Sequence, residues 1–409
     1  MKDIFQGLKA QPSMEKAFAY LEADRERTMQ EQIEICGIAS PSNKETVRAK
    51  HYFEMFKKLG FDETYMDEVD NVIGIIKGTG NGPTLVVGAH TDTVFLEDVD
   101  CTATLKDNGI VYGPGIADDT RGMVELLTIV RAMKDAGVKP VGDLIFIGNV
   151  GEESLGDLRG AKHLFKTLGD RIDGFLSIDG VGIDSLTVSA TGSYKYKATF
   201  RGTGGHSFGV FGIPNCIHAA GRAISKIANF KVPTNPKTTY NVGVAQGGVA
   251  VNAIPSEIRL MIDMRSNDMG ALNELEARIL EALKEGCAEE NAFWNHPSEV
   301  ITVEIERLGA RPAGVQPPDA IMPLACLASY EVCGVPADGL GAGSTDCNVP
   351  ISMGIPAAAV GRGGTSKYTH TVNEQWDPTD DFKGPQRTLL LIMGLVGMEG
   401  ASEPILPKR

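Results

Sequence analysis

The stretch Val86–Phe95, with the sequence VVGAHTDTVF, combines an apolar run with two polar residues that can do chemistry. His90 and Asp92 form the pattern His-x-Asp at the end of a predicted buried strand. In open α/β sheets, ligands bind at the carboxyl ends of the strands. A histidine at such an end can also be an ordinary strand-end side chain, so the pattern needs support from other parts of the sequence.

Further segments place possible metal ligands at predicted strand-to-loop junctions. They are Asp118 and Asp119 in GPGIADDTRG, Glu152 and Glu153 in GNVGEESLGD, Asp179 in FLSIDG and His370 in GGTSKYTHTVNE. Taken alone, an aspartate can cap the helix near Arg121, a glutamate pair can be a solvated loop, Asp179 can start a turn, and His370 can lie on the surface. Together, these junctions favour one shared site.

Carboxylates that converge at one edge of a sheet repel one another and raise one another's pKa. Two divalent cations would balance the negative charges of Asp118, Glu153 and Asp179. Pairs of metal ions about 3.5 to 4 Å apart are known from hydrolytic enzymes. Histidine and carboxylate ligands with an open coordination position suit zinc. The residues therefore predict a site for two Zn²⁺ ions, with Co²⁺ or Mn²⁺ as possible substitutes.

Alternating strands and helices must position these residues. The buried-strand runs NVIGII, TLVVGA and LIFIGNV, with a helical pattern over Gly122–Ala136, predict an α/β fold with a mainly parallel mixed sheet. We expect further helices at Ser13–Cys36, Glu45–Leu59, Asp319–Cys333 and Leu389–Met398, and a strand at Ala357–Val360. Two helices are thus expected to open the chain.

The pattern changes from about Ser193 into a strand, helix, strand, strand, helix, strand order. This order predicts an inserted α+β unit of the ferredoxin-like kind, with helices at Ile217–Ala228 and Leu272–Glu285. We expect residues 1–191 and 310–409 to form one domain and residues 192–309 the inserted one.

The charge and composition of the chain limit the classes of partner and compartment that it suits. A net charge of −14 and a pI near 5.1, without a basic block, argue against nucleic acid or an anionic membrane as a partner. The seven cysteines are scattered singly, which favours reduced thiols. No apolar run of 18 residues occurs, and the N-terminal segment lacks a signal-peptide pattern, so we expect a cytoplasmic protein.

The ordered motifs H-x-D, G-x-x-x-D-D, Glu-Glu, S-I-D-G, G-G-H-S and T-H-T-x-N-E resemble a family of dinuclear zinc hydrolases. That family includes aminoacylase, carboxypeptidase G, carnosinase, acetylornithine deacetylase and tripeptidase T. The resemblance runs from about residue 35 nearly to the C-terminus. It implies a catalytic α/β domain interrupted by a dimerisation or lid domain.

The resemblance also implies a role for each site residue. Asp118 would bridge two metals, with His90 and Asp179 completing one metal site and Glu153 and His370 the other. Asp92 would accept a hydrogen bond from His90 and fix its tautomer, and Glu152 would be the general base. A cis peptide bond is expected between Asp118 and Asp119.

Residues for the substrate follow from the same resemblance. His206 would stabilise the developing oxyanion, and Asn252 and Arg265 would hold the substrate's carboxylate or backbone. The loop of Gly363 and Gly364 would supply backbone donors. The inserted unit would form a homodimer and lend His206 to the neighbouring chain. Without the resemblance, His206 fits a turn histidine and Arg265 a solvated strand residue.

The expected activity is zinc-dependent hydrolysis of amide bonds in small peptides, most like tripeptidase T or carboxypeptidase G. Aspartate at position 179 supports this choice, because peptidases of the family tend to have aspartate there and deacylases glutamate. An N-acyl amino acid amidohydrolase is the alternative with the same site. A metal-binding homologue without catalysis is a third possibility, although neither Glu152 nor any expected ligand is missing.

Overall fold

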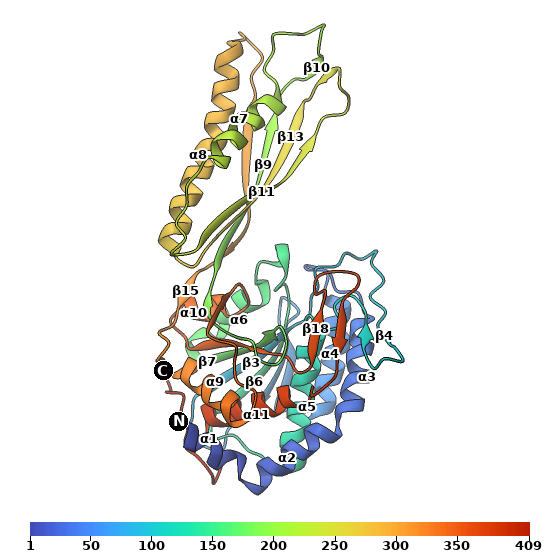
Figure 1. Ribbon diagram of the computed structural model, residues 1–409, viewed down its shortest axis with the longest axis vertical. Helices are drawn as coiled ribbons and strands as arrows, with labels where there is room; N and C mark the ends of the chain where they lie inside the picture. Colours follow the sequence, from blue (N-terminus) through green and yellow to red (C-terminus); the bar gives the residue numbers. More distant parts are fainter. The chain divides into compact units, whose positions relative to one another are not determined.

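The computed structural model describes all 409 residues, which separate into two compact units. Unit 1 comprises Met1–Ala190 and Val315–Arg409, and unit 2 comprises Thr191–Gly314. Figure 1 shows the elements of each unit. The α/β class with an inserted α+β unit, expected from the sequence, is confirmed.

Unit 1 is built on a nine-stranded mixed sheet in the order β1-β2-β6-β3-β7-β17-β8-β15, with β16 beside β8. The strands are β1 Glu63–Met66, β2 Val72–Ile76, β3 Thr84–His90, β6 Asp143–Asn149, β7 Gly174–Gly180, β8 Leu186–Ala190, β15 Gly314–Val315, β16 Gly341–Gly343 and β17 Ala357–Gly361. At its centre, β3 pairs in parallel with both β6 and β7, and β17 pairs in parallel with β7.

Helices cover both faces of this sheet, because its central strands are apolar on both sides. In β3, Leu85 and Val87 pack into the larger core, and Val86 packs into a second core on the opposite face. The helices of unit 1 are α1 Lys2–Lys9, α2 Pro12–Ala23, α3 Arg25–Cys36, α4 Thr46–Leu59, α5 Thr120–Ala136, α6 Arg159–Leu168, α9 Ile321–Val332, α10 Asn348–Ser352 and α11 Lys383–Val396. A small sheet is made of β4 Thr104–Leu105, β5 Val111–Tyr112, β18 Thr365–Lys367 and β19 Gln375–Asp377.

The start of the chain differs from the expectation of two helices. Four helices open the protein, because α1 precedes the predicted segment and Ser13–Cys36 is broken at Asp24. Asp24 leaves the helical conformation with φ −82° and ψ 3°, and its carboxylate accepts hydrogen bonds from Thr128 and Arg131 of α5. The break therefore follows from contacts with residues about a hundred positions away.

Unit 2 is a four-stranded antiparallel sheet in the order β11-β13-β9-β14 with two helices on one face (Figure 1). Its elements are β9 Gly192–Arg201, β10 Gly205–His206, α7 Cys216–Ala228, β11 Thr238–Gly247, β12 Ala253–Ile254, β13 Glu257–Ser266, α8 Met269–Trp294 and β14 Thr302–Arg311. Alternate residues of β13, among them Leu260 and Ile262, pack against α7 and α8. The short strands β10 and β12 pair separately.

Two general expectations can be compared with this structure. All seven cysteines are free, six of them buried and Cys333 half-buried. None of the helices combines the length with the apolar character needed to cross a bilayer.

Candidate active site

Three neighbouring parallel strands deliver predicted site residues to one edge of the large sheet. His90 ends β3 directly opposite Asn149, the last residue of β6, and Glu152 and Glu153 follow in the next loop. Asp179 stands near the end of β7, on the other side of β3. The apolar strands thus bring polar residues far apart in sequence into one place, as the sequence predicts.

Asp118 and Asp119 differ in what their side chains do. Asp119 caps α5 by accepting a hydrogen bond from the N–H of Gly122 at 3.2 Å, and it also accepts one from the N–H of His90 at 3.0 Å. The helix-capping explanation therefore holds for Asp119, whereas the carboxylate of Asp118 contacts the predicted histidines. The peptide bond between the two residues is cis, as expected.

The two oxygens of the Asp118 carboxylate lie in two separate clusters. Oδ1 is 3.1 Å from Nε2 of His90, which is 3.6 Å from Oδ1 of Asp179. Oδ2 is 3.0 Å from Nε2 of His370, which is 2.9 Å from Oε1 of Glu153. Asp118 is thus the residue that the two clusters share.

These separations fit a pair of bound cations. In a tetrahedral zinc site with ligands about 2.0–2.1 Å from the metal, neighbouring ligand atoms lie about 3.3 Å apart. The distances around Asp118 are close to that value, and the donor set consists of imidazole nitrogens and carboxylate oxygens, which suit zinc. The residues present therefore fit a dinuclear metal site.

Charge in the cluster supports the same interpretation. Burial alone would lower the pKa of His90, but its hydrogen bonds to Asp118, Asp179 and Asp92 outweigh burial and raise the pKa well above its usual range. Hydrogen bonds to Asp118 and Glu153 raise the pKa of the half-exposed His370 to about 10. Without metal ions, the buried carboxylates therefore draw protons onto both histidines, so the site is built to hold positive charge.

Asp92 organises the site through three hydrogen bonds to its carboxylate. The N–H groups of Glu152 and Glu153 both donate to it at 2.9 Å, and the hydroxyl of Ser42 donates at 2.6 Å. Nδ1 of His90 lies 3.0 Å from the backbone carbonyl of Asp92 and 3.4 Å from its carboxylate. Nδ1 of His90 is therefore closer to the backbone carbonyl of Asp92 than to the expected acceptor, the Asp92 carboxylate. The carboxylate mainly holds the loop of Glu152 and Glu153.

Sequence reasoning missed three buried residues at this site. Glu374 ends the quoted motif T-H-T-x-N-E, and its carboxylate accepts hydrogen bonds from the N–H groups of Gly115, Ala117 and Asp118 at 2.9–3.1 Å. Arg362 lies among the carboxylates. Asp346, in GAGSTD, accepts a hydrogen bond from Asn149, and burial raises its pKa to about 7. Glu374 was visible as part of a motif, but no spacing pattern marked the other two.

The two loop glycines differ in what they can offer a substrate. The N–H of Gly363 donates to Glu125 at 3.3 Å, and the Gly363 carbonyl accepts from Trp376 at 3.0 Å. The N–H of Gly363, expected as a donor to the substrate, is therefore hydrogen-bonded within the protein. Gly364 has a φ of +81°, a conformation that glycine adopts readily.

The predicted substrate residues of unit 2 lie at opposite ends of its sheet. His206 pairs with Ala253, and the N–H of Ser207 donates to the carbonyl of Asn252 at 3.0 Å, so His206 and Asn252 are neighbours. Arg265 lies eight residues beyond Glu257, the first residue of β13, which is roughly 26 Å along an extended strand. The three residues therefore do not form one cluster within unit 2.

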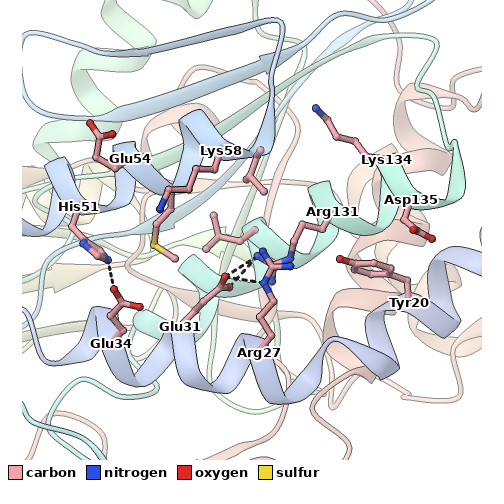
Figure 2. A pocket seen from close by; sticks show the side chains of 13 residues that line it. Tyr20, Arg27, Glu31, Glu34, His51, Glu54, Lys58, Arg131, Lys134 and Asp135 are labelled. Atoms are coloured by element: carbon pink, nitrogen blue, oxygen red, sulfur yellow. Dashed lines mark hydrogen bonds and ion pairs between the residues drawn. The ribbon is translucent and has the colours of Figure 1, made fainter.

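A cavity of about 760 Å³ in unit 1 contains none of these residues. It lies between α2, α3, α4 and α5, and Figure 2 shows that charged side chains dominate its lining. Some of these side chains contact one another, as Arg131 contacts Glu31 at 3.0 Å and His51 contacts Glu34 at 3.2 Å. The candidate active site is therefore the carboxylate and histidine cluster instead.

Known proteins of similar sequence include peptidases and deacylases. The chain is 28% identical to the protein YqjE of Bacillus subtilis (strain 168), which is described as uncharacterized, over 90% of this chain and 98% of that one. It is 28% identical to carboxypeptidase G2 of Pseudomonas sp. (strain RS-16) over 51% of this chain and 52% of that protein. It is 26% identical to a succinyl-diaminopimelate desuccinylase of Alkalilimnicola ehrlichii over 64% and 75%.

Solved structures agree on the fold. A tripeptidase of Staphylococcus aureus superposes with a TM-score of 0.73 at 24% identity, covering 90% of this chain and 97% of that one. The aminopeptidase PepT of Bacillus cereus gives a TM-score of 0.71 at 24% identity, over 90% and 98%. The family model described as peptidase family M20/M25/M40 matches residues 86–392. This match spans the predicted metal ligands and confirms the resemblance, so the chain is a metallopeptidase or amidohydrolase that belongs to peptidase family M20/M25/M40.

Proposed function

We propose that this protein hydrolyses amide bonds in small peptides, as a dipeptidase, tripeptidase or other exopeptidase. The reaction would use two divalent cations, for which zinc is the first candidate. The observation that carries the proposal is the position of Asp118, whose two oxygens lie in two different histidine and carboxylate clusters. His90 and Asp179 would hold one cation and Glu153 and His370 the other, with Asp118 shared. Cations bound there would polarise the scissile carbonyl and lower the pKa of a bound water.

Glu152 is the proposed general base. One of its carboxylate oxygens lies within 4.8 Å of a ligand atom of His90 and of Glu153, and the residue is buried. The hydrogen bond from its N–H to Asp92 fixes the backbone from which the carboxylate extends. A carboxylate in this place can take a proton from the attacking water and then donate it to the leaving nitrogen.

Peptides are preferred over N-acyl amino acids as the proposed substrate class. The similar folds of a tripeptidase and of the aminopeptidase PepT support this choice, as does aspartate at position 179. The desuccinylase relatives favour the second candidate, an N-acyl amino acid amidohydrolase with the same ligands. A panel of dipeptides and tripeptides, compared with N-acetyl and N-succinyl amino acids, tests the choice. Faster turnover of the acyl compounds would reverse it.

The metal requirement is tested in the same assay. Removal of metal by a chelator should abolish hydrolysis, and Zn²⁺, Co²⁺ or Mn²⁺ should restore it. Full turnover by protein whose metal content has been shown to be negligible would reject the proposed mechanism.

A homodimer through unit 2 is the proposed assembly, with His206 acting in the partner's active site. Arg265 pairs with Ser193 close to the point where the chain enters unit 2, whereas His206 lies at the other end of the sheet. One site that uses both residues is therefore more readily built from two copies of the chain. Apolar side chains near His206, including Phe208 at 90% exposure and Val249 at 95%, would be covered by such an interface.

The proposed location is the cytoplasm. The seven free cysteines are compatible with a reducing compartment.

A further inference from the structure

Arg362 places a buried positive charge directly among the carboxylates of the site. Its side chain is only 3% exposed. Nη1 lies 2.9 Å from Oδ1 of Asp118, 3.1 Å from Oδ1 of Asp119 and 3.7 Å from Oδ1 of Asp179. A guanidinium keeps its charge under all ordinary conditions, so this cation is a permanent part of the site.

The backbone around Arg362 holds the guanidinium in this place. Nη1 donates to the carbonyl of Ala117 at 3.0 Å, Nε donates to the carbonyl of Gly180 at 3.2 Å, and the N–H of Arg362 donates to the same carbonyl at 3.0 Å. These bonds join Arg362 to the loop before Asp118 and to the end of β7.

The neighbouring glycines add to this constraint. A Cβ atom at Gly361 would come within 2.3 Å of the Gly182 carbonyl oxygen, and one at Gly363 within 1.9 Å of the Asp381 carbonyl oxygen. Because the backbone on both sides of Arg362 packs this closely, the loop has little freedom to move its side chain elsewhere.

The contacts of Arg362 fall on one of the two proposed metal positions. Oδ1 of Asp118 and Oδ1 of Asp179, which Nη1 contacts, are also the oxygens nearest to Nε2 of His90. The second position uses the other oxygen of Asp118, with His370 and Glu153. The guanidinium thus shares its oxygens with the cation at the His90 position.

We propose that Arg362 is a positioning residue that makes the two metal positions unequal. It holds Asp118, Asp119 and Asp179 together when metal is absent, and it lowers the affinity for the cation at the His90–Asp179 position by repulsion and by sharing the Asp118 oxygen. The Glu153–His370 position then binds the first cation and the His90–Asp179 position the second. This inference rests on the proposed dinuclear site.

The test is a calorimetric titration of the metal-free full-length protein with Zn²⁺. The wild type should bind two ions in two resolved steps. Arg362→Met removes the charge and keeps similar bulk, so the weaker step should strengthen at least about tenfold and the two steps should move together. Metal-free Arg362→Met should also melt at a lower temperature than metal-free wild type, because the carboxylates lose their counter-charge. Arg362→Lys should keep the two steps apart.

A second buried arginine provides the matched control. Arg131 lines the cavity of Figure 2, which contains none of the site residues, and it is paired with Glu31 there and with Asp24. Arg131→Met should lower the melting temperature without changing the separation of the two zinc steps. A purely structural role for Arg362 would give the same pattern as this control.

The possible results distinguish a failure of the proposed dinuclear site from a failure of the role of Arg362. If the wild type binds fewer than two zinc ions, the dinuclear site is wrong and the role of Arg362 falls with it. If the wild type binds two ions and folded Arg362→Met keeps the same separation, only the role of Arg362 is overturned. If Arg362→Met does not fold, the double variant Arg362→Met with Asp119→Asn replaces it, because the second change also removes a negative charge. The two zinc-binding steps should again move together.

Discussion

The backbone N–H of Glu152 donates a hydrogen bond to the carboxylate of Asp92 at 2.9 Å, which ties the proposed general base to the strand that carries His90. The same carboxylate accepts the N–H of Glu153. Asp92, predicted as the partner of His90, therefore also sets the position of the proposed base and of a proposed metal ligand in the loop after β6.

Replacement of Asp92 by asparagine should lower both kcat and metal affinity. The amide offers one acceptor oxygen where the carboxylate offers two, so one N–H of the glutamate pair loses its partner at a cost of about 1–3 kcal/mol. Partners of metal ligands typically contribute 10–100-fold, which is the expected loss in kcat and in zinc affinity. Ser42→Ala is the control, because it removes the hydroxyl that donates to Asp92 and to the Glu153 carbonyl but leaves both N–H bonds of Asp92 in place, and it should have a smaller effect. Unchanged kcat and zinc affinity in Asp92→Asn would show that the anchor is dispensable.

The two adjacent glutamates should respond differently to substitution by glutamine. Glu152→Gln removes the proton acceptor, so kcat should fall by about 10²–10⁴-fold while two metal ions remain bound. Glu153→Gln weakens one ligand of the His370 cluster, so metal content should fall and added zinc should restore part of the activity. Elemental analysis with steady-state kinetics measures both. Near wild-type kcat in Glu152→Gln would contradict the assignment of the base.

Zinc binding should release protons at neutral pH. Without metal, hydrogen bonds to Asp118 and Glu153 raise the pKa of His370 from 6.5 to about 10. Because the folded-state pKa lies above the unfolded one, protonated His370 stabilises the metal-free protein below about pH 6.5, and this contribution is lost as the pH rises through about 10. A metal ion needs the neutral imidazole, so the apparent zinc affinity should increase over the same range.

Calorimetry at about pH 7.5 in two buffers of different ionisation enthalpy measures this release. His370→Gln should release about one proton fewer than the wild type. A heat of zinc binding that does not depend on the buffer would show that His370 is already neutral in the metal-free protein.

A mixed dimer tests whether His206 acts across the proposed interface. His206→Ala and Glu152→Gln should each be nearly inactive alone. In a heterodimer of the two, the His206→Ala chain keeps its own Glu152 and receives His206 from its partner, so one working site should return. Heterodimers of verified composition without recovered activity would reject action in trans, and a fully active monomer would reject the dimer requirement.

Much of the site could be predicted because its residues follow strongly apolar strands. Parallel strands β3, β6 and β7 end together, so His90, Glu153 and Asp179 had to meet at one edge. Helix boundaries were less predictable, as the break at Asp24 shows, since it depends on pairing with Arg131 of another helix. The pattern of α8 also continued past the expected end at Glu285 to Trp294.

No pattern in the sequence marked Arg362 as a buried charge, because an arginine in this position would suit an exposed loop equally well. Only the fold brings this residue to Asp118, 244 positions earlier in the chain. Glu374 similarly supports the Asp118 loop from 256 positions away. Such distant contacts leave no local spacing pattern, so the roles of Arg362 and Glu374 were not predicted, whereas Asp92, two residues from His90, was.

The most direct test of the dinuclear site is an anomalous scattering map of crystals grown with Zn²⁺. We predict two peaks about 3.5–4 Å apart, one between His90 and Asp179 and one between Glu153 and His370, with one oxygen of Asp118 bound to each. A single peak, or two peaks of which only one contacts Asp118, would contradict the account.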